Sequence, residues 1–440
     1  MEKFFKLKEK NTNVKTEIIA GITTFLAMAY ILGVNPMILG DSGMDAHSVF
    51  IATAVSAGVA SIIMGLVANY PVALAPGMGV NALFTYTVCL TMKFSWQAAL
   101  AAVFVSGLFF LLISVTGIRK MIINAIPKQL KLAIGAGIGF FIAFVGLKNA
   151  GIIVANESTF VALGDFAEPT VLLSLFGILL TLALLCKKVP AAVFIGMLVT
   201  AVVGIVCGFA GIEGMPALPE QWITFDMKTE TVGAFVDGFS DLFANPGAAF
   251  VAIFSFLFVD FFDTAGTLVA VGNRTGLVNE EGELENVERA LLADSVGTVV
   301  GAAMGTSTVT SFVESTSGVE VGGRSGLTAV TTGILFFVSV LFSPVVLAAV
   351  TNAVTAPALV VVGILMAQQL GGVDWDDFVS AASGFVTIIV MILGYSISNG
   401  IALGFITYAL TMAASGKAKK VSPIIWALVV VFVLYFAFLI

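Results

Sequence analysis

The chain carries apolar runs that recur from one end to the other, each close to the roughly 20 residues that a helix needs to cross a bilayer. Only 11% of its residues are charged, against roughly a quarter in an ordinary soluble domain, so it cannot assemble a water-soluble surface. The sequence also lacks the short alternating segments that are typical of membrane β-barrels. It therefore predicts an all-α polytopic membrane protein.

Glycine, proline and charged residues divide the apolar runs into fourteen predicted spans. They cover residues 18–38, 48–68, 71–92, 96–117, 129–147, 170–186, 189–210, 248–271, 289–304, 306–323, 326–350, 354–370, 377–395 and 398–415. The distribution of charge supports this count, because cytoplasmic loops collect Lys and Arg. With a cytoplasmic N-terminus, only Lys93, Lys148 and Lys228 of the 20 basic residues fall outside. The last apolar stretch, 423–440, is either a further span or a helix lying against the bundle.

Residues that would indicate other functions are few. The Lys-rich residues 1–17 lack the compact leader of a secretory signal, so we expect no removed segment. Three cysteines, Cys89, Cys186 and Cys207, have no metal-type spacing and are interpreted as small core residues. The single histidine, His47, falls in a predicted extracellular loop. We therefore expect no metal, no cofactor, no nucleic-acid partner and no enzyme activity.

A polar, acidic stretch over about residues 211–245 separates the spans into two groups of seven. Because seven is odd, the second group enters the membrane with the opposite orientation to the first. This arrangement is typical of secondary transporters built from a 7+7 inverted repeat.

The third span of each half is interrupted. The first contains Tyr70-Pro-Val-Ala-Leu-Ala-Pro76-Gly-Met-Gly79, and the second contains Gly305-Thr-Ser-Thr-Val-Thr-Ser-Phe312, whose β-branched residues indicate extended chain. Each is followed by a helical stretch of about half a span, so both helices are expected to begin near the midplane. Such a break can simply kink a packed helix. Two breaks at matching places in opposite halves instead indicate a substrate site.

Two acidic residues, Asp260 and Asp263, lie three residues apart on one face of the eighth predicted span. A carboxylate near the centre of a membrane helix costs about 2.5 to 3.5 kcal/mol, so both are expected to face the interior of the bundle. Glu314 follows the extended stretch of the tenth span and is a third candidate. An alternative for Glu314 is a capping box with Ser311. Asn81, near the start of the other half-helix, serves either the site or a capping role.

These groups suit a planar heterocycle, because carboxylates accept paired N–H bonds while helix N-termini bind ring acceptors. Burial disfavours a charged carboxyl group, so Asp263 or Glu314 is expected to exchange a proton. Substrate binding and protonation would then be coupled.

The motifs resemble one known family over nearly the whole chain, the AzgA-like purine permease branch of the nucleobase cation symporters (nucleobase/ascorbate transporters). The stretches that carry the resemblance are Gly21-Ile-Thr-Thr-Phe-Leu-Ala-Met-Ala-Tyr30, Ala75-Pro-Gly-Met-Gly-Val-Asn81-Ala82, Val259-Asp-Phe-Phe-Asp263-Thr-Ala-Gly-Thr267, Gly305-Thr-Ser-Thr-Val-Thr-Ser-Phe-Val-Glu314-Ser315 and Asn399-Gly-Ile401. The resemblance implies import of adenine, guanine or hypoxanthine by proton symport with alternating access. It also implies short strands in spans three and ten.

The family's organisation implies a core domain of residues 1–117 and 248–350, a gate domain of residues 118–210 and 351–440, and an extracellular linker over 211–247. By similarity, Asp263, Glu314 and Asn81 are the substrate-binding residues, and the neighbouring Val313 and Thr264 join that set. For proton coupling the candidates are Asp263, Glu314 and Asp260.

The alternative functions are an anion transporter of the same inverted-repeat fold, a channel, and an intramembrane enzyme. Acidic residues in the crevice would repel an anion, and broken helices at a closed midplane favour alternating access over a channel. We expect a multi-pass protein of the plasma or inner membrane. Its expected partners are a purine base, a proton and the lipid bilayer, with a homodimer as the candidate assembly.

Overall fold

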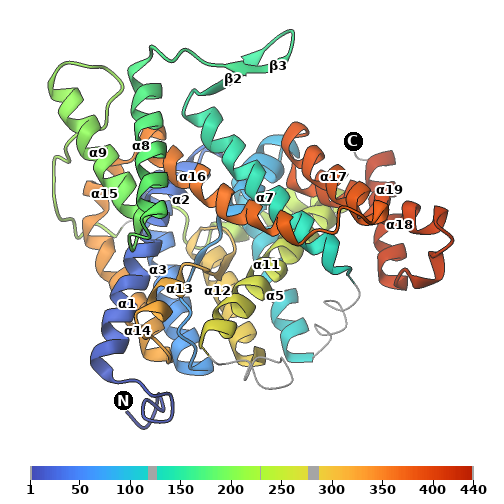
Figure 1. The fold of residues 1–440 in the computed structure, drawn as a ribbon, viewed down its shortest axis with the longest axis horizontal. Helices are drawn as coiled ribbons and strands as arrows, with labels where there is room; N and C mark the ends of the chain where they lie inside the picture. Colours follow the sequence, from blue (N-terminus) through green and yellow to red (C-terminus); the bar gives the residue numbers. More distant parts are fainter. Residues whose placement is uncertain (1, 117–125, 228, 276–286, 439–440) are drawn as a thin grey trace.

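The computed structural model describes residues 2–116, 126–227, 229–275 and 287–438 and is mostly helical (Figure 1). The first half contains α1 (Val14–Met28), α2 (Ile31–Gly40), α3 (Ala46–Ile63), η1 (Met64–Ala68), β1 (Leu74–Pro76), α4 (Met78–Ala82), η2 (Leu83–Thr91), α5 (Trp96–Thr116), α7 (Lys128–Asn149), β2 (Ile153–Asn156), β3 (Phe160–Leu163), α8 (Pro169–Cys186) and α9 (Ala192–Phe209).

The second half is also built mainly of long helices and contains the strand β4 (Val309–Ser311). It contains η3 (Ala234–Val236), α10 (Phe239–Ala244), α11 (Pro246–Thr275), α12 (Val287–Met304), β4 (Val309–Ser311), α13 (Ser315–Glu320), α14 (Gly326–Ser339), η4 (Val340–Phe342), α15 (Ser343–Ala349), α16 (Asn352–Ala367), η5 (Gln368–Gly372), α17 (Phe378–Leu393), α18 (Ile397–Ala414), η6 (Ala418–Lys420) and α19 (Pro423–Phe438).

The order of these elements reproduces the fourteen predicted spans. Within the described ranges, nine helical segments are long and apolar enough to cross a membrane by themselves. The other five predicted spans correspond to β1 with α4 and η2, to α11, to α12, to β4 with α13, and to α17. In the third and tenth spans, a strand and a turn divide the segment, so neither contains one helix long enough to cross a membrane by itself.

Polar residues at the predicted membrane surfaces set several helix starts. The side chains of Asn13, Asp45 and Ser396 accept hydrogen bonds from backbone N–H groups in the first turns of α1, α3 and α18. Such caps satisfy N–H groups that have no partner within the helix. The helices therefore begin where polar side chains precede apolar runs.

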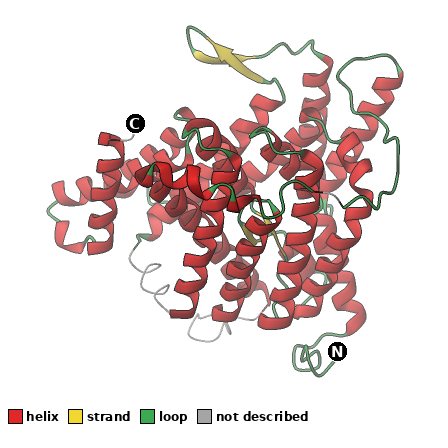
Figure 2. Ribbon diagram, turned by 180° about the vertical axis from the view of Figure 1, so that it is seen from behind, coloured by secondary structure: helices red, strands yellow, loops and turns green. Residues whose placement is uncertain are grey.

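The structure adds two features to the predicted topology. The first predicted span is bent, because α1 ends at Met28 and α2 begins at Ile31, with Tyr30 in the bend. Between α7 and α8 the strands β2 and β3 form an antiparallel hairpin, which projects from the opposite end of the molecule to the N-terminus (Figure 2).

Two sets of helices pack together. One contains α7 against α16 and α17, and α8 against α9 and α16. In the other, α1 and α3 pack against α14, and α5 packs against α11 and α12. The buried Glu17 of α1 holds the start of α14 in place, accepting bonds from Arg324 N (2.8 Å) and Thr328 Oγ1 (2.6 Å). The two sets contain spans of the predicted gate and core respectively, although the division into domains stays a prediction.

The apolar stretch from residue 423, whose position the sequence left open, forms α19 and packs against α18 and α11. The Phe432 ring lies 5.8 Å from Phe254 and 6.0 Å from Phe405 between ring centres. The helix lies at the edge of the bundle, beside α18 (Figure 1).

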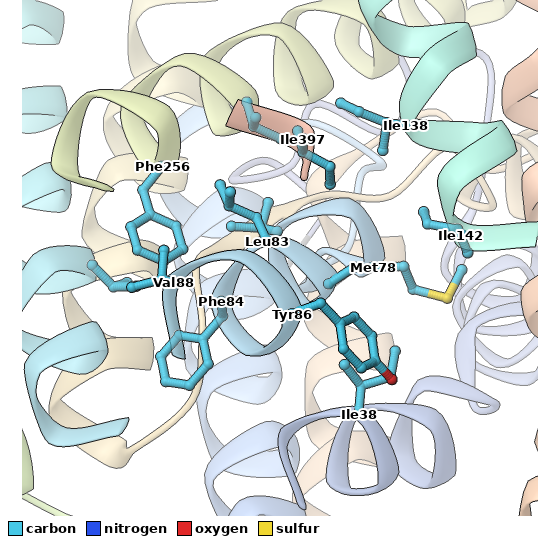
Figure 3. Packing of buried hydrophobic residues seen from close by; sticks show 14 of the residues in the cluster. Ile38, Met78, Leu83, Phe84, Tyr86, Val88, Ile138, Ile142, Phe256 and Ile397 are labelled. Carbon is cyan, nitrogen blue, oxygen red and sulfur yellow. The ribbon is translucent and has the colours of Figure 1, made fainter. Parts of the chain in front are cut away.

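The second half of the third span is packed on all sides. Figure 3 shows Leu83, Phe84 and Tyr86 of η2 pointing in different directions from one turn of π-helix. Around them lie Ile38 of α2, Ile138 and Ile142 of α7, Phe256 of α11 and Ile397 of α18. The short helix α4 runs directly into η2. The apolar packing around η2 therefore also fixes the position of α4.

Candidate functional site

The two interrupted spans meet as a pair of short antiparallel strands. In β1 and β4, Leu74 pairs with Ser311, Ala75 with Thr310 and Pro76 with Val309. This confirms the predicted strands in spans three and ten. The pairing extends by one backbone bond at each end, from Gly77 N to Thr308 O (3.1 Å) and from Phe312 N to Ala73 O (3.0 Å). Because the strands are antiparallel, the helices that follow them leave the crossing in opposite directions.

The two helices differ in length. After β1, α4 continues directly into η2, so helical chain extends from Met78 to Thr91. After β4, α13 covers only Ser315–Glu320, although the sequence predicted a half-span that reaches about residue 323. It ends early because Val321 and Gly322 form the turn toward α14, with Gly322 at a φ of +111°.

Asp263 of α11 lies against the strand crossing. Its Oδ2 accepts a hydrogen bond from Thr310 Oγ1 at 3.2 Å. A β-carbon on Gly77 would lie 2.7 Å from Thr310 Oγ1 and 3.3 Å from Asp263 Oδ2. A side chain at Gly77 would therefore crowd both groups, which explains the need for glycine where β1 ends.

Glu314 stands at the junction of β4 and α13 and accepts a 2.5 Å hydrogen bond from the hydroxyl group of Tyr30. Its carboxylate and that of Asp263 are close enough to interact electrostatically. The capping-box alternative is wrong, because Ser311 belongs to β4 and Glu314 makes no side-chain cap to α13. Val313, beside it, has a side chain that is 44% exposed.

Asn81 is fully buried one turn into α4 and faces the chain that leads into β4. Its Oδ1 accepts a short hydrogen bond from Ser307 Oγ. Its Nδ2 has no hydrogen-bond partner among the described residues. The structure therefore links Asn81 to the tenth span while leaving one donor on a buried amide.

The remaining predicted residues form a buried network behind the strands. Asp260 Oδ2 accepts from Thr298 Oγ1 at 3.0 Å, and the same hydroxyl lies 3.2 Å from the carbonyl oxygen of Val309 in β4. Thr264 donates to Asp294 Oδ1 at 2.8 Å, and Ser311 Oγ donates to the same oxygen at 3.0 Å. The structure thus brings Asp263 and Glu314 together at the crossing. Asp260 and Thr264, on α11, bond residues of α12 that in turn contact β4.

Sequence reasoning missed Tyr30 and Asp294. The signal for Asp294 was an acidic residue within the ninth predicted span, which marks a candidate by the same cost argument as Asp263. Tyr30 closes the first motif of the resemblance, and a tyrosine inside an apolar span needs a partner for its hydroxyl group. In the part of the chain that the structure describes, no cluster of His, Cys, Asp or Glu could hold a metal ion.

Comparison with known families decides what this arrangement belongs to. The model of the "Permease family" (Xan_ur_permease) matches residues 15–403. The chain belongs to this family. Members are permeases, so the prediction that the chain is not an enzyme is confirmed, as is a multi-pass membrane protein.

Curated relatives match over most of their length. The chain is 51% identical to "Guanine/hypoxanthine permease PbuG" of Bacillus subtilis, with 100% of both chains covered. It is 40% identical to "Adenine permease AdeP" of Escherichia coli, with 100% of this chain and 96% of that protein covered. A third, "Nucleobase transporter PlAzg2" of Paenibacillus larvae, is 35% identical, with 90% of this chain and 77% of that protein covered.

Solved structures with the same fold are more distant in sequence. The transmembrane domain of a cyanobacterial bicarbonate transporter, BicA, has a TM-score of 0.66 at 15% identity and covers 89% of this chain and 97% of that one. Murine Slc26a9, an anion transporter solved in the inward-facing state, has a TM-score of 0.62 at 12% identity, with 91% and 68% covered. These likenesses confirm the predicted inverted-repeat fold.

Proposed function

We propose that this permease imports purine nucleobases by proton symport with alternating access. The observation that carries the proposal is the meeting of two carboxyl groups, Asp263 and Glu314, at the crossing of β1 and β4. The names of the relatives support the substrate class, since PbuG is a guanine/hypoxanthine permease and AdeP an adenine permease.

Purine bases present N–H donors and ring acceptors on the edges of a flat ring system. Glu314 and Asp263 accept N–H bonds from the base. The first backbone N–H groups of α4 have no partner within their own helix, and they face ring nitrogen or carbonyl oxygen atoms. The amide donor of Asn81 that lacks a partner adds a further hydrogen-bonding group beside the crossing.

Proton coupling follows from the proximity of the two acids. Two charged carboxylates in a half-buried site repel each other, so binding one proton removes part of the unfavourable energy. A base that donates N–H groups then needs one carboxylate charged while the other holds the proton. Substrate and proton therefore bind together, and the proton gradient drives uptake.

Alternating access requires the strand crossing to move relative to a second group of helices. We assign the crossing to the proposed core, residues 1–117 and 248–350, and the second group to the proposed gate, residues 118–210 and 351–440. In this assignment the base is enclosed between the crossing and the gate helices α7 and α18, which approach α4 and η2.

The second candidate function is anion transport, because BicA and Slc26a9 share the fold. At such low identity the likeness concerns the fold alone. Two carboxylates at the crossing oppose binding of an anion, so the site favours a neutral base.

Uptake by purified protein in proteoliposomes tests the proposal. With an inside-alkaline pH gradient, wild-type protein should accumulate labelled hypoxanthine, and a protonophore should abolish the accumulation. Asp263→Asn and Glu314→Gln should each lower uptake on the order of a hundredfold, because a hydrogen bond to a charged group contributes about 1.5–3 kcal/mol. Bicarbonate uptake that hypoxanthine does not inhibit would favour the anion transporter instead.

The matched controls are Asp165→Asn and Glu157→Gln, which make the same chemical changes at exposed residues of the α7–α8 connection. Both should transport as the wild type does. Normal uptake by Asp263→Asn and Glu314→Gln would remove the proposed roles. Uptake that ignores both the gradient and the protonophore would remove proton symport.

A further inference from the structure

Tyr30 is a buried residue whose hydroxyl group bonds the carboxylate of Glu314. It lies in the bend between α1 and α2 and is 1% exposed. One side of the residue lines an apolar cavity of about 280 Å³, whose other walls include Phe25, Gly33, Phe194, Met197, Val346 and Val354. The hydroxyl group instead points to Glu314 Oε1, 2.5 Å away.

This hydrogen bond joins two packed elements. Glu314 precedes α13, and α13 packs against α1, the helix that leads into Tyr30. Phenol and carboxylate therefore approach each other from neighbouring segments whose backbones are in contact. A hydrogen bond from a phenol to a carboxylate is charge-assisted, and such bonds are among the strong hydrogen bonds in proteins.

The bond has a consequence for substrate recognition. A carboxylate with both oxygens available pairs with two neighbouring N–H donors at once, as in fork-shaped pairs with arginine. With one lone pair of Oε1 engaged by Tyr30, a second N–H donor has to share that oxygen with the phenol, so its bond to Glu314 is weaker than the bond to Oε2. Glu314 then accepts one strong N–H bond from a base instead of two.

We infer that Tyr30 is a specificity-determining residue, which limits Glu314 to one strong N–H bond and so lets the site accept purines with one or two adjacent donors almost equally. The inference rests on the proposed purine transport. Guanine carries N1–H beside a 2-amino group, whereas hypoxanthine carries N1–H beside a C–H. Their difference at a carboxylate is thus one N–H donor, the one whose bond to Glu314 is weakened by Tyr30.

Equilibrium binding of labelled guanine and hypoxanthine to purified, detergent-solubilised protein tests this role. In Tyr30→Phe the ring stays and the hydroxyl group is lost, so both oxygens of Glu314 become available. The preference for guanine over hypoxanthine, expressed as the ratio of the two dissociation constants, should rise on the order of tenfold, the value of one additional bond to a charged acceptor.

The matched control is Tyr435→Phe, which removes a tyrosine hydroxyl that bonds Asn399 Oδ1 at 3.3 Å between α19 and α18. It should leave the ratio unchanged. A general loosening of the fold in Tyr30→Phe would weaken binding of both bases by the same factor. A ratio that stays at the wild-type value would overturn the inference.

A measurement on the wild-type protein tests the inference without any variant. The two dissociation constants should differ by less than about threefold while Tyr30 occupies Oε1. Guanine binding that is tenfold or more tighter than hypoxanthine binding in the wild type would overturn the role of Tyr30. Absence of saturable binding of either base would overturn the proposed function, and the inference with it, which distinguishes the two failures.

Discussion

Tyr86 of η2 and Tyr395 of the turn between α17 and α18 pack edge to face, with ring centres 5.5 Å apart. Two further groups fix the pair. Tyr86 OH donates to Asp41 Oδ2 at 2.8 Å, and Lys148 Nζ lies 3.3 Å from Tyr395 OH and 5.1 Å from the centre of its ring. All four residues lie toward the predicted extracellular side. The contact thus joins a span of the proposed core to a span of the proposed gate at that side.

Removing the Tyr395 ring should open the extracellular side. Cys89 lies three residues after Tyr86 and is buried, whereas Cys186 is exposed and Cys207 is partly exposed. In a background with Cys186→Ser and Cys207→Ser, Tyr395→Ala should speed labelling of Cys89 by a membrane-impermeant maleimide added outside. The loss of one aromatic pair, about 0.5–1.5 kcal/mol beyond its apolar burial, predicts a severalfold increase in rate.

Tyr408→Ala in the same background is the control, because Tyr408 is partly buried on α18 and is another ring truncation in the proposed gate. It should leave the labelling rate of Cys89 unchanged. Equal rates in the Tyr395→Ala and parent proteins would contradict an extracellular closure at this aromatic pair.

Asp294 should matter more for stability than its position outside the crossing implies. Its Oδ1 accepts hydrogen bonds from the hydroxyl groups of Thr264 in α11 and Ser311 in β4. Asp294→Ala therefore leaves two buried hydroxyl groups without this acceptor. Each unsatisfied group costs about 1–3 kcal/mol. The apparent melting temperature of the purified protein should fall in Asp294→Ala and fall less in Asp294→Asn, which keeps an acceptor oxygen. An Asp294→Ala protein as stable as the wild type would contradict the network.

The fold was largely predictable because the bilayer imposes helix length on every spanning segment. Apolar runs located the spans, the β-branched residues around Thr310 indicated extended chain there, and the family resemblance implied the strand that contains Pro76. The break at Tyr30 was not predicted, because Ala29 and Tyr30 continue an apolar stretch, although Gly33 and Pro36 follow in the same span and both residue types weaken a helix.

The candidate site was predictable in part. The cost of burying charge identified Asp263 and Glu314, and the structure places both at the crossing. Helical spacing could not show which residues next to Asp263 face the strand crossing. Thr264 follows Asp263 directly, yet its hydroxyl group bonds Asp294. The Tyr30–Glu314 bond joins residues 284 positions apart, and only the tertiary fold shows such a contact.

The cap of α3 predicts a pH-dependent term in stability. Partial burial raises the pKa of Asp45, but hydrogen bonds from Ser48 lower it by more, so the pKa lies below its usual range. A carboxyl group with a lowered pKa in the folded state stabilises the fold above its unfolded pKa, about 3.9, and loses that effect as the pH falls through the folded value. Asp45→Ala should cost about 1 kcal/mol at neutral pH.

Thermal unfolding of the two proteins at a series of pH values checks this sign. The difference between wild type and Asp45→Ala should be constant above about pH 5 and shrink as the pH falls through the acidic range. Asp376→Ala, at an exposed acid in the loop before α17, should show no such trend. A difference that grows on acidification would contradict the cap.

The backbones of spans two and eleven are in contact at Gly65 and Gly326. A β-carbon on Gly326 would collide with the carbonyl oxygen and the α-carbon of Gly65, and neither atom can rotate away. Gly326→Ala should therefore separate η1 from α14 and cost about 1–3 kcal/mol, as overpacking of a filled interior does. The control is Gly40→Ala at the end of α2, where nothing lies within 4 Å of the added carbon. The melting temperature should fall in Gly326→Ala and hold in Gly40→Ala, and equal stability of the two variants would contradict the close approach.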